Sequence, residues 1–145
     1  MSDPRSRRST RFNRSMLALL ASTAAAMWML PATASDTSAA QQLARWNAQA
    51  GAPGDAAQGR SFFTTRQGGE WSCSSCHGNP PVKTGQHANT GKDIAPLAPA
   101  FNPQAFTDSA RVDKWLRRNC NDVLTRECSA LEKANLLAYL IGLRP

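Results

Sequence analysis

The run Cys73-Ser-Ser-Cys76-His77 sets two thiols two residues apart, with a histidine directly after the second. This order suits covalent attachment of a c-type haem, because two such thiols can add to the two vinyl groups along one edge of the macrocycle. The adjoining histidine is then the proximal iron ligand. A haem-free zinc or dithiol module is the alternative, but the zinc site lacks a well-spaced fourth ligand. The motif therefore predicts one covalently bound haem c, attached through Cys73 and Cys76 and ligated by His77.

Residues 1–34 have the composition of a secretory signal peptide. Five arginines precede an apolar run over residues 16–30, and Pro31-Ala-Thr-Ala34 supplies a small-residue cleavage site. The apolar run is shorter than the roughly 20 residues that a helix needs to span a bilayer. We therefore expect cleavage after Ala34 and a periplasmic domain, residues 35–145, with no membrane span.

Most of the net positive charge belongs to the predicted signal peptide. The whole chain has 17 basic and 10 acidic residues, of which five basic and one acidic lie in residues 1–34. Residues 35–145 therefore carry a net charge of +3, which two haem propionates would bring close to +1. The high isoelectric point reflects mostly the targeting segment, and we expect no nucleic-acid partner.

Helical patterns predict most of the regular structure in residues 35–145. We expect helices over residues 39–50, from 56 to about 65 after a cap at Asp55, from 107 or 108 to about 119, and from a capping box formed by Ser129 and Glu132. Residues 78–103 hold five prolines and three glycines, so they predict an irregular loop wrapped around the haem. With no strand pattern visible, the fold class is all-α.

Two pairs of residues give the first resemblance to a known fold. Gly59-x-x-x-Phe63 precedes the haem motif, and Leu136-x-x-Tyr139 lies in the last predicted helix. These pairs resemble the crossing helices of class I cytochromes c, where the glycine lets the helices approach closely. The resemblance implies a class I cytochrome c fold wrapped around the haem.

The remaining cysteines, Cys120 and Cys128, are predicted to form a disulfide. Two cysteines left over in an oxidising compartment usually pair. The loop between them is short, and the chain-entropy model assigns such a bridge about 2.5 kcal/mol of stability.

The sixth iron ligand cannot be a methionine, because all four methionines lie in residues 1–34. Asn119 is the favoured candidate, since it continues the series Val112, Trp115, Leu116 at i, i+3, i+4 and i+7 on one helix face. An asparagine there could instead end the helix as a left-handed cap. His87 is a second candidate ligand, and an open site is a third possibility.

Three segments resemble the sphaeroides haem protein (SHP) family, an unusual branch of class I c-type cytochromes. They are Lys114-Trp-Leu-Arg-Arg-Asn119-Cys120, Gly91-Lys-Asp-Ile-Ala-Pro-Leu-Ala-Pro99 and Phe106-Thr-Asp-Ser-Ala-Arg111. The resemblance implies that Asn119 ligates ferric haem and leaves on reduction, so that dioxygen and other diatomic molecules bind. It also implies the Cys120–Cys128 disulfide. The loop carrying His87 departs from the family pattern.

These observations predict a periplasmic monohaem cytochrome that couples electron transfer to binding of O2, NO or CO. The alternative function is a plain electron carrier whose iron is permanently held by His77 and His87. Its expected partner is a redox protein, such as a di-haem or membrane b-type cytochrome, met through a small transient interface. An oxidoreductase activity on bound O2 or NO is left open by the sequence.

Overall fold

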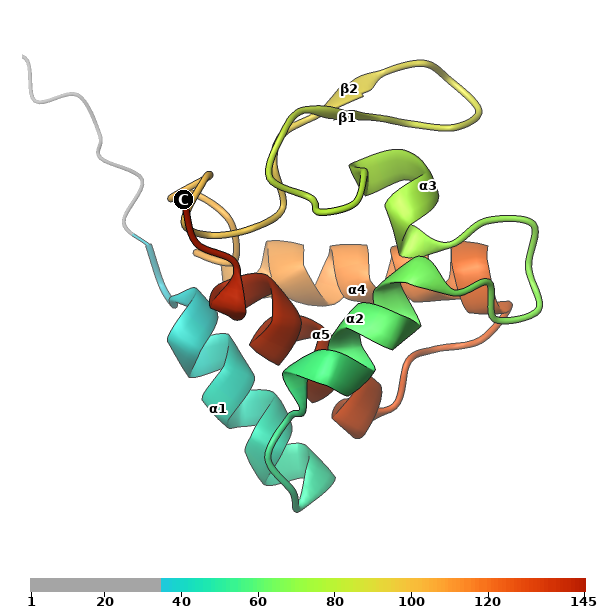
Figure 1. Ribbon diagram of the computed structural model, residues 1–145. Helices are drawn as coiled ribbons and strands as arrows, with labels where there is room; N and C mark the ends of the chain where they lie inside the picture. Colours follow the sequence, from blue (N-terminus) through green and yellow to red (C-terminus); the bar gives the residue numbers. More distant parts are fainter. Residues whose placement is uncertain (1–34) are drawn as a thin grey trace, which may run out of the picture. The chain divides into compact units, whose positions relative to one another are not determined.

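The computed structural model describes residues 35–145, which contain five helices and one short antiparallel strand pair (Figure 1). The predicted signal peptide lies outside the described residues. In chain order the elements are α1 (Ala39–Ala50), α2 (Ala56–Thr64), α3 (Cys73–His77), β1 (Gly85–Gln86), β2 (Asp93–Ile94), α4 (Ser109–Leu124) and α5 (Ala130–Gly142). Within this part of the chain, no helix is long and apolar enough to cross a membrane.

The long helices begin at side chains that cap them. A side-chain oxygen of the residue before each helix accepts a backbone N–H from the first turn, which satisfies a donor that the helix leaves unpaired. The capping residues are Ser38, Asp55, Asp108 and Ser129. At Ser129 the side chain of Glu132 also accepts the Ser129 N–H at 2.7 Å, which completes the predicted capping box.

The core lies where α2 crosses α5. Gly59 makes the crossing possible, because a Cβ atom at that position would lie 1.9 Å from the carbonyl oxygen of Asn135. The close approach brings the rings of Phe63 and Tyr139 to 5.6 Å between centroids. Helix α1 adds the buried Trp46 to the same core. The pairing of Gly59 and Phe63 with the last helix is therefore confirmed.

Helix α4 is longer than the sequence predicts. It continues past Asn119 to Leu124 and ends at Thr125, which has a left-handed backbone with φ of 57°. The extension is stabilised because Cys120 and Leu124 bury their side chains against Cys128. The interpretation of Asn119 as a helix-ending cap is wrong, since Thr125 takes that role.

The proline-rich loop contains regular structure that was not predicted. Gly85 pairs with Ile94 and Gln86 with Asp93 in a two-residue antiparallel ladder. Strands this short carry no alternating pattern that a sequence could show, and their stability comes from neighbours. The rest of the loop is irregular, as expected.

Candidate functional site

The haem-attachment motif forms its own helix, α3. The two serines between the cysteines fix its start: the N–H of Ser72 donates to Oγ of Ser75 at 3.0 Å, and the hydroxyls of Ser72 and Ser74 lie 2.9 Å apart. One helical turn places residues three apart on the same side. The structure thus gathers Cys73, Cys76 and the following histidine on a single turn.

The two thiols of α3 are unpaired, and that of Cys73 is poorly suited to metal or redox chemistry of its own. Cys73 and Cys76 form no disulfide. Cys73 packs against the main core, and its burial raises the pKa of the thiol to about 11. A zinc ligand or a redox dithiol needs a thiolate, which a lowered pKa favours. Among residues 35–145, no group of three or more potential ligand side chains could hold a metal ion.

The His77 side chain meets the requirements of an iron ligand. It is half-buried beside Phe63, with 6.4 Å between ring centroids, and burial lowers its pKa, which favours the neutral imidazole that binds metals. Its Nδ1 atom is buried without a hydrogen-bond partner. Because Nδ1 is turned into the protein, Nε2 is the ring nitrogen that can reach a metal. With two free thiols on the same turn, the residues fit a covalently attached haem.

A backbone contact that the sequence did not predict holds the strand pair against α3. A Cβ atom on Gly85 would lie 2.2 Å from the carbonyl oxygen of Cys76 and 2.9 Å from Cα of His77. The N–H of Ala88 donates to Sγ of Cys76 at 3.3 Å. An isolated glycine at a strand often marks a close backbone approach, and this was the available signal.

The candidate ligand His87 lies in the turn between β1 and β2. It is half-buried and lines a cavity of about 620 Å³ together with Trp71, Ser74, Cys76 and Asp93. Its Nδ1 accepts the N–H of Asn89 at 3.3 Å. His87 therefore lies beside Cys76, next to the helix that carries His77.

Asn119 lies on α4, apart from the haem motif; in the view of Figure 1, α4 runs beneath α3 and the strand pair. The four residues that the sequence placed on one helix face differ in exposure. Val112 and Leu116 are buried, whereas Trp115 and Asn119 are exposed along the edge of the buried stripe. The Asn119 amide forms no hydrogen bond with another described residue, so it is available to a group outside the polypeptide.

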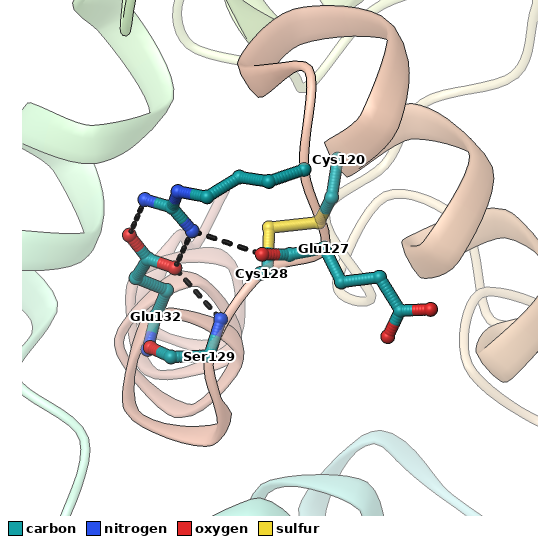
Figure 2. Close-up of a disulfide and its surroundings, with 6 residues drawn as sticks. Cys120, Glu127, Cys128, Ser129 and Glu132 are labelled. Carbon is teal, nitrogen blue, oxygen red and sulfur yellow. Dashed lines mark hydrogen bonds and ion pairs between the residues drawn. A yellow bond between two sulfur atoms is a disulfide. The ribbon is translucent and has the colours of Figure 1, made fainter.

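The segment after Asn119 is anchored, as Figure 2 shows. The sulfur atoms of Cys120 and Cys128 lie at disulfide distance, as predicted, with their Cα atoms 5.5 Å apart. Arg126 pairs with Glu132 at 2.7 Å and donates to the carbonyl of Glu127 at 2.9 Å. These contacts bind the end of α4 to the start of α5.

Comparison with known proteins identifies relatives along most of the chain. Residues 49–140 match a family described as a domain of unknown function (DUF1924). Cytochrome c-type protein SHP of Cereibacter sphaeroides is 55% identical over 114 residues, which cover 76% of this chain and 88% of that protein. Cytochrome c'' of Methylophilus methylotrophus is 47% identical over 79 residues, which cover 54% of this chain and 55% of that protein.

Solved structures give the same result. The structure of oxidized SHP, described as an oxygen-binding cytochrome c, matches with a TM-score of 0.70 and 54% identity, covering 74% of this chain and 99% of the other. Oxidized cytochrome c'' of Methylophilus methylotrophus matches with a TM-score of 0.64 and 35% identity, covering 74% and 95% of the two chains. The predicted fold, family and cofactor are thereby confirmed, and the chain belongs to the SHP family of all-α, monohaem c-type cytochromes, which bind haem c covalently.

Proposed function

We propose that this chain is a periplasmic electron-transfer cytochrome in which Asn119 is a displaceable sixth ligand, so that O2, NO or CO binds after reduction. The single observation that carries the proposal is the exposed Asn119 amide, which has no hydrogen bond to another described residue and directly precedes the anchored Cys120. The SHP relative, described as oxygen-binding, supports the same function. The signal-like residues 1–34 support the location.

In this proposal α3 holds the cofactor. Cys73 and Cys76 provide the two thioether sulfurs, and His77 provides the proximal nitrogen through Nε2. The haem supplies a one-electron Fe(III)/Fe(II) couple and, where an axial position is free, a site for diatomic molecules. The hairpin of β1 and β2 keeps α3 in place, because Gly85 and Ala88 contact Cys76 directly.

Asn119 has the chemistry of a weak and reversible ligand. An amide oxygen is a hard, neutral donor, so it prefers Fe(III) to the softer Fe(II). Residues 35–145 contain no methionine, so the thioether that usually holds reduced iron in class I cytochromes is missing. Once the Asn119 oxygen has withdrawn, its NH2 group can donate a hydrogen bond to a diatomic ligand.

The alternative is a permanent ligand at His87, and the contacts of the hairpin argue against it. An axial pair of histidines must approach the haem from opposite sides. His87 lies next to Cys76 on the helix that carries His77, and its neighbour Ala88 donates to Cys76 Sγ. To reach the opposite side, the hairpin would have to leave α3. We therefore favour Asn119.

The electron donor is proposed to be another cytochrome, of di-haem or membrane b-type. The net charge of residues 35–145, near +1 once two propionates are included, gives little long-range steering. A small, transient interface is the expected form of such an encounter.

The test compares Asn119→Ala with a matched control, Asn121→Ala, on the purified holoprotein. Asn121 is also exposed on α4, but lies about half a turn from the Val112 face. Optical spectra are recorded for the ferric and the dithionite-reduced protein, with and without CO. We expect Asn119→Ala to change the ferric spectrum and CO affinity, and Asn121→Ala to match the parent protein.

Two results would overturn the proposal. One is an Asn119→Ala protein whose ferric spectrum and CO affinity are those of the parent. The other is a low-spin ferrous parent protein that ignores CO and becomes CO-reactive in His87→Ala, which would establish the electron-carrier alternative.

A further inference from the structure

We propose that Trp115 forms one wall of the diatomic-binding site and limits the access of ligands and water to it. This inference rests on the proposed function, because it takes Asn119 to face the haem. It assigns a specificity role to a residue that the attachment motif and the axial ligands do not include.

The first observation is that Trp115, a large apolar residue, is exposed to solvent. Trp115 is 45% exposed, and among the described residues only Leu131, at 44%, is a comparably exposed large apolar residue. The neighbouring Val112 and Leu116 on the same helix are buried. An apolar cofactor lying along this edge of α4 would remove the indole from water, which is favourable in proportion to the area covered.

The second observation is the register of Trp115 with Asn119. Residues four apart lie on the same side of a helix, here about 6 Å apart along the axis. Side chains on a helix lean toward its N-terminus, so the Asn119 amide leans toward the turn of Trp115. A haem that Asn119 reaches from this edge therefore extends over Trp115 as well.

The third observation is that two cationic side chains flank the indole ring of Trp115. Nζ of Lys114 lies 5.7 Å and Cζ of Arg118 lies 5.6 Å from the ring centroid, both within the range of cation–π attraction. The ring borders a hollow of about 500 Å³, which is also lined by Asp108, Ala110 and Arg111. The indole is thus positioned by neighbours on its own helix and is not packed into the protein core.

These features define what Trp115 does when Asn119 withdraws. The Asn119 amide is small and forms no hydrogen bond within the described residues, whereas the indole is bulky and is flanked by Lys114 and Arg118. A bulky apolar group beside the vacated position narrows the route by which small molecules enter and keeps water out. Trp115 then controls the rate of ligand entry, while Asn119 controls whether the position is open.

The experiment measures CO rebinding after flash photolysis of the reduced holoprotein, in Trp115→Ala, Trp115→Phe and the control Leu131→Ala. Truncation of a tryptophan at a tight contact commonly changes a binding equilibrium or rate by about tenfold. We expect CO to rebind about tenfold faster in Trp115→Ala, less than that in Trp115→Phe, and at the parent rate in Leu131→Ala.

A second readout locates the indole independently of ligand kinetics. In the diamagnetic ferrous–CO protein, the haem ring current should displace the indole N–H proton resonance of Trp115, which Trp115→Phe identifies by its loss. An undisplaced Trp115 resonance, or a Trp115→Ala rate equal to the parent rate, would overturn the inference. If Asn119→Ala still alters the ferric spectrum, only the role of Trp115 fails. If Asn119→Ala leaves the ferric spectrum unchanged, the proposed function itself is overturned, and the inference about Trp115 with it.

Discussion

Substitution of Gly59 by alanine should break the helix crossing on which the fold depends. A Cβ atom at this position would lie 1.9 Å from the carbonyl oxygen of Asn135, 2.5 Å from its carbonyl carbon and 2.9 Å from Cβ of Tyr139. Ordinary contact begins at 3.4 Å, so α2 would have to move away from α5 by about 1.5 Å. Two of the obstructing atoms belong to the backbone of α5 and cannot rotate aside.

The expected loss is about 3 kcal/mol or more in the free energy of unfolding, at the upper end of the usual cost of overpacking. Domains of this size are stable by only about 5–15 kcal/mol, so the change is large. The matched control is Gly142→Ala, because a Cβ atom at the end of α5 meets nothing within 4 Å. That substitution should be neutral or stabilising by up to about 1 kcal/mol, since it removes freedom from the unfolded chain.

Urea unfolding of the holoprotein, followed by far-ultraviolet circular dichroism, measures both variants. The urea concentration at the midpoint of unfolding should be lower for Gly59→Ala than for the parent protein. The slope of the unfolding free energy against urea concentration should not change, because the same surface is exposed on unfolding. Surface substitutions usually change the free energy of unfolding by less than about 0.5 kcal/mol. If Gly59→Ala changes it by no more than that, the account of the α2–α5 crossing is refuted.

Two further predictions concern the anchor beyond Asn119. The hydrogen bond from Arg126, assisted by the N–H of Ser129, lowers the pKa of Glu132 from 4.5 to about 2. A lowered pKa in the folded protein stabilises it above pH 4.5, and this stability is lost as pH falls toward 2. Glu132→Gln should therefore be less stable than the parent by up to about 1 kcal/mol near pH 7, a gap that closes toward pH 2 in urea titrations. Replacement of Cys120 and Cys128 by serine should lower the free energy of unfolding by about 2.5 kcal/mol, and an equally stable double variant under oxidising conditions would contradict the disulfide.

Local signals account for what the sequence predicted correctly. Helix α1 covers the predicted residues because Ser38 caps its start and Gly51, with φ of 67°, ends it. The helix crossing was predictable from Gly59 because only a residue without a side chain fits there. In each case one residue type satisfies a requirement that its immediate neighbours impose.

The errors occur where distant contacts decide the structure. Asn121 and Asp122 are poor helix formers, so the sequence favours an end near Asn119. The helix continues because Cys120 is tied to Cys128 and because Leu124 is buried beside both. The strand pair depends likewise on Gly85, whose contact is with Cys76 nine residues earlier in the chain.

In the candidate site, too, local features were predictable from the sequence and those set by distant contacts were not. The motif of Cys73, Cys76 and His77 is contiguous, so its spacing alone predicts how the side chains are grouped. The buried residues of α4 are Val112, Leu116, Cys120 and Leu124. The buried face is therefore centred on these four residues, and not on the series that includes Trp115 and Asn119. Periodicity placed Trp115 and Asn119 on one face with Val112 and Leu116, whereas in the structure only Val112 and Leu116 are buried and the other two are exposed.

The length of α4 constrains how Asn119 can act as a displaceable ligand. A residue at the end of a helix can move by unwinding of the last turn, but Asn119 lies five residues before the end at Leu124. The backbone beyond it is bonded as far as Thr125, whose N–H donates to the carbonyl of Asn121 at 3.0 Å. The disulfide at Cys120 further restrains this part of the chain. In the proposed function, withdrawal of Asn119 from the iron would therefore have to be a rotation of its own side chain, which would cost little and would leave the helix, and Trp115 on it, in place.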